Sequence, residues 1–174
     1  MNEDLPPLGD LIHLSERELV VAGLRNAQRL IQCMHEELPG VDVLHHAVVL
    51  ADRVLRGISR PDTLHDACEA AYRVAGRMAG EWRKSSNDDA ARRTIAVQAI
   101  HLSIDAVADF DVDPYSSVHM TNRSLELSQQ LGIRELMQEL LRDIELIQLN
   151  PRLCGPDRLN IDAFGPLWQA PHLA

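Results

Sequence analysis

The sequence predicts an all-α fold: a single-domain bundle of about six mostly antiparallel helices. From residue 14 to residue 150, apolar residues recur at the i, i+3, i+4, i+7 spacing of amphipathic helices. No stretch shows the sustained apolar–polar alternation that is typical of a strand. The predicted connections are short, about 3–5 residues, which favours antiparallel neighbours. A length of 174 residues suits one domain.

The first helix, predicted over 15–38, has the clearest start. Ser15 and Glu18 match the capping-box pattern, and Leu14 and Leu19 stand at the two positions of a hydrophobic staple. Pro39 and the glycine after it end the segment. We expect one buried stripe on this helix, made of Val20, Leu24, Ala27, Ile31, Met34 and Leu38.

The second and third helices are predicted over 42–57 and 61–82. Asp42 is placed to cap the second helix, and Pro61 suits the first turn of the third. The inner face of the third helix consists mostly of small residues, with Trp82 at its far end: Leu64, Ala67, Cys68, Ala71, Ala75, Met78 and Trp82. Small residues let neighbouring helices approach closely. Alternatively, Ala67, Ala71 and Ala75 leave room for a small molecule between the third and fourth helices.

Three further helices are predicted over 87–107, 114–132 and 133–150. The fourth begins at an Asn87 cap and is apolar on two faces, which suits a central helix with neighbours on both sides. Pro114 starts the fifth, whose inward residues are Val118, Leu125 and Leu131, flanked by Met120 and Leu127. The sixth is strongly amphipathic, with an inner face of Ile133, Leu136, Met137, Leu140, Leu141, Ile144 and Ile147.

The two ends of the chain differ from this helical region, 14–150. Residues 1–13 form an acidic lead broken by prolines, and residues 151–174 contain several prolines and glycines, so they cannot form one helix. Phe164 and Trp168, two of the six aromatic residues, lie in this second segment. Burying each is worth about 1.5–3 kcal/mol, so we expect a strap that packs on the bundle. The alternative is a peptide in which Phe164 and Trp168 bind a partner.

The charge balance excludes several classes of partner. The formal net charge is −9, which argues against a sequence-blind nucleic-acid binder and against docking on anionic lipid. No apolar run approaches the roughly 20 residues of a membrane span. Three cysteines at distant positions, Cys33, Cys68 and Cys154, are typical of buried free thiols. Together with the acidic N-terminus, which is unlike a secretory signal, they predict a cytoplasmic protein.

Two pairs of residues are the candidate metal ligands. His65–Asp66 resembles the doublet of HD-type phosphohydrolases, which implies a metal site that His35 or His46 upstream and Asp105 or Asp109 downstream could complete. Separately, His101 and Asp105 stand one helical turn apart, a spacing at which two ligands can share a metal. The metal-dependent hydrolase hypothesis uses His65, Asp66, His101 and Asp105. The continuation of the doublet in that family is missing here, and acidic residues are common in the first turn of any helix. His101, Asp105 and Asp109 also share a strip with Thr94 and Gln98, which is typical of a solvated face. We therefore expect ionisable side chains to face water.

Other catalytic and cofactor patterns are missing from the sequence. No nucleophile elbow, phosphate-binding glycine loop or dinucleotide fingerprint occurs, so no catalytic residue and no cofactor is predicted. Asp109, Asp111 and Asp113 imitate the start of a calcium loop. Pro114 then occupies the sixth position, where glycine is needed, and Met120 the twelfth, where a bidentate glutamate is needed.

Three segments follow a recurring order: Ala47 to Gly57, the Ala-rich run from Ala67 to Ala79, and Leu140-Leu141-Arg142-Asp143-Ile144. In this order, over residues 47–151, the chain resembles uncharacterised Ala-rich helical proteins of planctomycete-type bacteria. In those proteins the last segment continues into a Gly-Asn-Pro run, whereas here Asn150-Pro151 comes later and the glycine is missing. The chain is also similar to Ala-rich immunity proteins of bacterial toxin systems. The first resemblance implies the helical fold and no assigned activity.

Because no catalytic constellation is found, the sequence favours a protein-protein interaction module without catalysis, either immunity-like or an oligomeric scaffold. Its acidic surface favours a basic protein partner; self-association is the other expectation. A metal-dependent hydrolase and a binder of a small molecule between helices are the alternatives.

Overall fold

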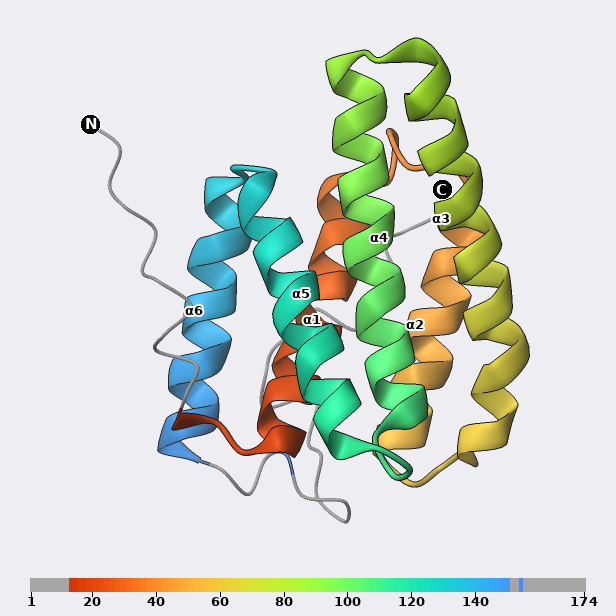
Figure 1. Ribbon diagram of the computed structural model, residues 1–174. Coiled ribbons are helices and arrows are strands. Elements are labelled where there is room, and N and C mark those ends of the chain that lie inside the picture. Colours follow the sequence, from red (N-terminus) through yellow and green to blue (C-terminus); the bar gives the residue numbers. More distant parts are fainter. Residues whose placement is uncertain (1–12, 151–153, 155–174) are drawn as a thin grey trace.

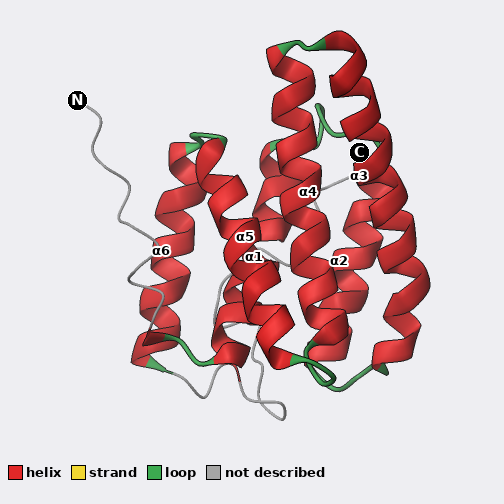
Figure 2. Ribbon diagram, viewed as in Figure 1, coloured by secondary structure: helices red, strands yellow, loops and turns green. Residues whose placement is uncertain are grey.

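The computed structural model describes residues 13–150 and residue 154. Its helices are α1 (Glu16–Cys33), α2 (Val41–Leu55), the short 3-10 helix η2 (Pro61–Leu64), α3 (His65–Ser85), α4 (Asp88–Asp109), α5 (Pro114–Gln130) and α6 (Arg134–Leu149). The described residues contain no strand (Figure 2). The all-α bundle expected from the sequence is therefore confirmed.

The six α-helices run up and down along one direction, so that each runs antiparallel to the next (Figure 1). We call the end where α1, α3 and α5 begin, and where α2, α4 and α6 end, the base of the bundle. The α3–α4 pair extends beyond the other helices at the opposite end (Figure 1). Helix α6 lies at one edge and packs chiefly against α1.

Several helix boundaries follow the end signals of the sequence, but the expected Asp42 cap is wrong, because α2 begins at Val41 after Gly40 and Asp42 lies inside its first turn. Ser15 and Glu18 form the expected capping box, and Asn87 accepts a hydrogen bond from the Ala90 amide at 2.7 Å. Helix α1 ends at Cys33, earlier than expected, although Met34 and Leu38 remain buried in the turn that follows. The chain then forms a turn in which the amides of Glu37 and Leu38 both donate to the Met34 carbonyl at 2.9 Å.

Helix α1 is buried on all sides, which the expectation of one buried stripe missed. Every residue from Leu19 to Ile31 is buried, including Arg25, Asn26 and Arg29. The helix packs against α2, α4, α5 and α6. Helix α4 is also central, as its two apolar faces predict, since it contacts α1, α2, α3 and α5.

Hydroxyl side chains line the contact of α5 with α1 and α4. Ser117, Thr121, Ser124 and Ser128 are all fully buried. Ser124 Oγ donates to the Ala99 carbonyl at 2.7 Å, and Asn26 Nδ2 donates to Ser128 Oγ at 2.7 Å. These short side chains are hydrogen-bonded as burial requires, and they pack beside Gly23 of α1.

Four expectations about single side chains are wrong. Ile58, expected on the inner face of the second helix with Leu55, is 58% exposed. Trp82 is 42% exposed and lies on the projecting α3–α4 pair, so it has few neighbours to cover it. Cys33, at the end of α1, is exposed rather than buried. Leu141 is only partly buried, whereas its neighbours on α6, Leu140 and Ile144, are buried.

Candidate functional site

The predicted metal ligands lie on two adjacent helices but do not gather around one point. His65 and Asp66 are exposed in the first turn of α3. On α4, His101 Nδ1 lies 2.9 Å from Asp105 Oδ2. Among the residues that the structure describes, no group of three or more His, Cys, Asp or Glu side chains could hold a metal ion. The metal-dependent hydrolase therefore remains a prediction from the sequence.

An open cleft of about 410 Å³ lies near the base, between the start of α3 and the end of α4. It is lined by Pro61, Asp62, His65, Cys68, Asp105, Ala108 and Asp109. His65 and Asp105 thus share the cleft, whereas Asp66 lies outside its lining. Three carboxylates and no Lys or Arg line the cleft, so its electrostatics favour a cationic group.

Two titratable groups beside Asp105, Cys68 and His101, have raised pKa values. Burial raises the pKa of the Cys68 thiol to about 12, and the charges of Asp105 and Asp109 act in the same direction. A thiol with such a pKa is a poor nucleophile at neutral pH. Burial alone would lower the pKa of His101, but the hydrogen bond and charge of Asp105 outweigh it and raise that pKa.

The strip of α4 that carries His101 and Asp105 is more buried than a solvated face would be. Thr94 is 1% exposed, and its hydroxyl contacts the Met78 carbonyl at 3.1 Å. The ring of Tyr72, on α3, meets that of His101 edge to face at a centroid distance of 5.4 Å. Helix α3 therefore covers much of the strip, and only its end at Asp109 is exposed.

The alanines that could have left room for a small molecule do not line the cleft. Ala67, Ala71 and Ala75 are 8%, 0% and 7% exposed, and all three belong to the hydrophobic core. The cleft instead lies beside the first turn of α3 and is lined largely by polar side chains.

A second feature of the base is a set of exposed apolar side chains beside carboxylates. Ile58 is 58% exposed, Val112 85% and Tyr115 83%. The α2–η2 and α4–α5 connections are neighbours, because Pro61 and Asp62 line one cleft with Ala108 and Asp109. We call Ile58, Asp111, Val112 and Tyr115 the base surface.

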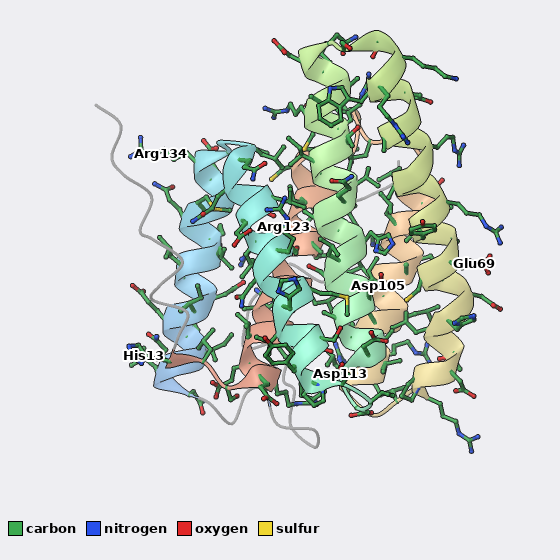
Figure 3. All side chains as sticks on the ribbon, viewed as in Figure 1. His13, Glu69, Asp105, Asp113, Arg123 and Arg134 are labelled. Atoms are coloured by element: carbon green, nitrogen blue, oxygen red, sulfur yellow. The ribbon has the colours of Figure 1, made fainter. Side chains whose placement is uncertain are left out.

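Hydrogen bonds fix the shape of the α4–α5 connection. The amides of Val112 and Asp113 donate to the Asp109 carbonyl at 2.9 and 2.8 Å. Asp113 caps α5, because its carboxylate accepts a hydrogen bond from the Ser116 amide at 3.0 Å. It lies closer to the base of the bundle than Asp105 does (Figure 3). The carboxylate of the calcium-like pattern thus serves as a helix cap, and the connection presents Val112 and Tyr115 to solvent.

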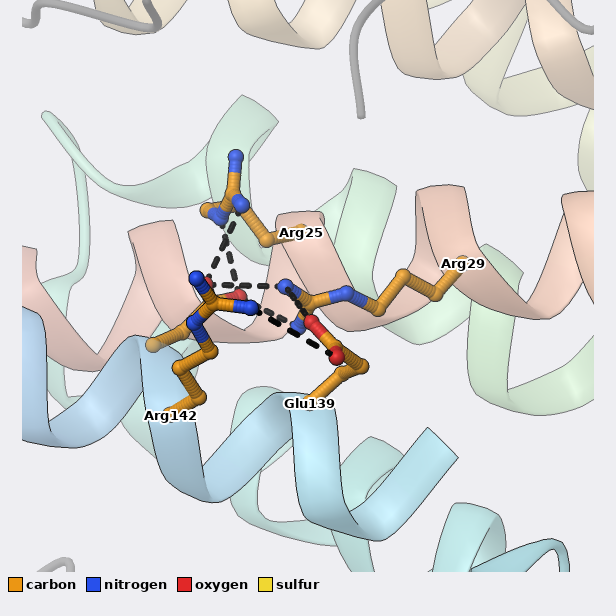
Figure 4. Close-up of polar contacts among 5 residues, drawn as sticks. Arg25, Arg29, Glu139 and Arg142 are labelled. Atoms are coloured by element: carbon orange, nitrogen blue, oxygen red, sulfur yellow. Dashed lines mark hydrogen bonds and ion pairs between the residues drawn. The ribbon is translucent and has the colours of Figure 1, made fainter. Parts of the chain in front are cut away.

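A buried ionic cluster, which the sequence analysis missed, joins α1 to α6. Arg25 Nε and Nη2 donate to Asp143 at 2.9 and 3.1 Å, and Arg29 donates to both oxygens of the same carboxylate (Figure 4). Arg29 also lies 3.5 Å from Glu139. Burial lowers the pKa of Arg25, and the hydrogen bond that Arg25 donates to Asp143 opposes that effect.

This cluster corrects the expectation that ionisable groups face water. Asp143 and Arg25 are each 1% exposed, so no solute can reach them in the folded chain. Asp52 of α2 also departs from this expectation, since it is only 7% exposed and pairs with Arg56. The signal for Asp143 was its place between Leu140 and Ile147, inside the apolar face of the sixth helix.

Beyond α6 the structure describes Cys154 alone, which is 2% exposed. Arg17 donates to the Cys154 carbonyl and also to the Leu55 carbonyl. Asp111 lies near enough to the same guanidinium to act on its pKa, although burial has the larger effect and lowers it. Phe164 and Trp168, the predicted interaction residues, lie outside the described residues.

No described helix contains an apolar run long enough to cross a bilayer. No protein-family model matches the chain, and comparisons with curated proteins and with solved structures find no match.

Proposed function

We propose that the chain is a cytoplasmic protein-interaction module without catalysis, which binds a basic protein through the base surface. The observation that carries this proposal is the exposure of Val112, on the hydrogen-bonded α4–α5 connection, and of Tyr115, in the first turn of α5, which are 85% and 83% exposed. Large apolar side chains that remain exposed beside a polar rim are typical of interaction sites.

Charge supports the choice of partner. Asp109, Asp111 and Asp113 alternate with the apolar residues of this connection, and the whole chain carries a net charge of −9. Complementary potentials speed association and select partners, so a basic surface with an apolar centre fits the base. The exposed thiol of Cys33 suits a reducing compartment. An immunity-type protein and an oligomeric scaffold are the two forms of this function.

The test compares capture of proteins from the native cell by the parent chain and by two matched variants. Tyr115→Ser removes the aromatic ring from the base surface, whereas Tyr72→Ser removes one from α3, where Tyr72 is 65% exposed. We expect a basic protein to be captured by the parent and by Tyr72→Ser, and to be lost with Tyr115→Ser. Added salt should weaken the capture.

Equal capture by all three chains, or a captured set without basic proteins, would refute the proposal. Sedimentation of the purified chain tests whether the chain associates with itself. A dimer that Tyr115→Ser dissociates would show that the partner is a second copy.

The cleft suggests a second candidate function, binding of a small cationic molecule, because Asp62, Asp105 and Asp109 line it without a basic side chain. Calorimetric titration with a polyamine tests this function. Asp105→Asn should weaken binding, and Glu145→Gln, on exposed α6 surface, should not. Absence of binding to the parent chain would dismiss the candidate.

A further inference from the structure

Beyond the end of α6, the described residue Cys154 lies at the base of the bundle. Cys154 is buried, and its carbonyl is held by Arg17 near the start of α1. The same guanidinium binds the last residue of α2, Leu55, and lies near Asp111. The remaining residues, 155–174, therefore leave the described structure at a point enclosed by α1, α2 and the α4–α5 connection.

The apolar residues of the base surface belong to the chain segments next to this exit point: the one that follows α2, and the one that joins α4 to α5 together with the first turn of α5. Ile58 follows Leu55 by three residues, and Val112 is the neighbour of Asp111. Ile58, Val112 and Tyr115 are among the most exposed large apolar side chains of the described residues. An apolar surface at such a place needs an occupant, because water contact with it is unfavourable.

The last segment of the chain has the side chains for this role. It carries Phe164 and Trp168 together with Leu159, Ile161 and Leu167. Ten residues separate Phe164 from Cys154 and can span at most about 36 Å, so reach is not limiting. A short tether of this kind holds the segment near the surface at an effective concentration on the order of mM, so weak contacts are enough to keep it bound.

We propose that residues 155–174 dock on the base surface of their own chain, with Phe164 and Trp168 covering Val112, Tyr115 and Ile58. The segment is then an intramolecular occupant of an apolar surface. If the proposed function holds, on which this consequence rests, the segment also competes with the partner, so that partner binding requires its release.

The experiment follows the fluorescence of Trp168 in the full chain. Trp82→Phe leaves Trp168 as the single indole, since the chain has two tryptophans. Acrylamide quenching and the emission maximum are compared with those of a synthetic peptide of residues 155–174. We expect weaker quenching and a blue-shifted maximum in the full chain.

Two variants in the Trp82→Phe background locate the docking site. Val112→Asp places a charge in the base surface and should return quenching and emission to the values of the peptide. Val43→Asp makes the same change in the first turn of α2, at the opposite end of the bundle, where Val43 is 38% exposed. It should leave the fluorescence unchanged. Thermal melting verifies that both variants are folded, and Tyr115→Ser replaces Val112→Asp if the latter is not.

Peptide-like quenching in the Trp82→Phe chain overturns the proposal, as does protection that survives both Val112→Asp and Tyr115→Ser. These measurements involve no partner, so they fail or succeed independently of the capture experiment. Loss of capture by Tyr115→Ser with a solvent-exposed Trp168 would support the interaction module and refute the docked segment.

Discussion

Gly23 lies where α1 packs directly on Thr121 of α5. A Cβ atom at Gly23 would stand 2.6 Å from Thr121 Cγ2, closer than carbon atoms can approach without a shift. Thr121 is fully buried and β-branched, so it has little freedom to rotate away. We predict that Gly23→Ala lowers the free energy of unfolding by about 1–3 kcal/mol, as measured by urea titration.

Gly76 provides the matched control for this substitution. It lies inside α3, and a Cβ atom there would meet nothing within 4 Å. Gly76→Ala should raise stability by about 0.5–1 kcal/mol, because alanine favours the helix. If the two variants change stability in the same direction, steric contact at Gly23 is not the cause.

Asp143 neutralises two arginines inside the bundle. Replacing it with Asn would remove the buried carboxylate to which Arg25 and Arg29 both donate, and the half-exposed Glu139, 3.5 Å from Arg29, would compensate only in part. Removing one partner of a buried ion pair typically costs about 3–5 kcal/mol. Glu145→Gln, an exposed change on the same helix, should alter stability by less than about 0.5 kcal/mol. Denaturant titration of both variants checks the contrast. Similar midpoints would mean that the cluster contributes little.

His101 should make stability depend on pH near neutrality. Because Asp105 raises the pKa of His101 in the folded chain, the stabilising contribution is complete below the unfolded pKa of about 6.5. It is lost as pH rises through the higher folded pKa. Asp105 is partly exposed, so the effect is at most of the order of 1 kcal/mol.

The measurement is the Tm of the parent and of Asp105→Asn between about pH 6 and pH 8.5. The parent should lose more stability over this range than the variant, and the imidazole shifts of His101 should titrate at lower pH in Asp105→Asn. Equal slopes would show that the pair does not stabilise the fold.

Single residues explain which local features the sequence could predict. Ser15, Asn87 and Pro114 act through neighbours three or four positions away, so their roles at helix starts are visible in the sequence. The burial of Arg25 depends on Asp143, 118 residues later, and spacing along one helix carries no information about such a partner.

At the scale of elements, α6 shows how burial separates two adjacent leucines. Leu140 is 3% exposed, whereas Leu141 is only partly buried. We predict that Leu140→Asp unfolds the domain, because a buried unpaired charge costs more than typical domain stability allows. Leu141→Asp should leave a folded chain with a lower Tm, as followed by circular dichroism. Equal melting curves would contradict this prediction.

The sequence predicted only in part which helices lie at the centre of the bundle. The two apolar faces of α4 indicated several neighbours, and α4 has them. Helix α1 carries Arg25, Asn26, Gln28 and Arg29, which by periodicity resemble a solvated face. These residues are covered by α5 and α6, and such coverage is a property of the assembled bundle.

The candidate site was predictable to a similar extent. His101 and Asp105 were expected to share a strip because i, i+4 positions lie together on a helix, and they form a pair. That His65 would line the same cleft as Asp105 depends on the packing of α3 against α4. The base surface had no sequence signal, since Val112 and Tyr115 look like ordinary core residues until their neighbours are known.

For the whole molecule, the arrangement predicts a gradient of local stability. Helix α1 contacts four helices, and α6 packs chiefly against α1. Hydrogen exchange should therefore be slowest at the amides of residues 19–31 and faster along α6, which lies at the edge of the bundle and contacts fewer helices. Exchange at equal rates in both helices would show that the bundle opens only as one unit.

The burial of α1 by other helices also has a consequence for folding during synthesis of the chain. Ribosomes synthesise proteins from the N-terminus at roughly 5–20 residues per second, so the two guanidinium groups of α1 exist for several seconds before Asp143 is added. During that time the first helix cannot be enclosed without leaving its cations uncompensated. Nascent chains shorter than about 143 residues should therefore remain loosely packed and depend on chaperones, and final consolidation awaits translation of the sixth helix.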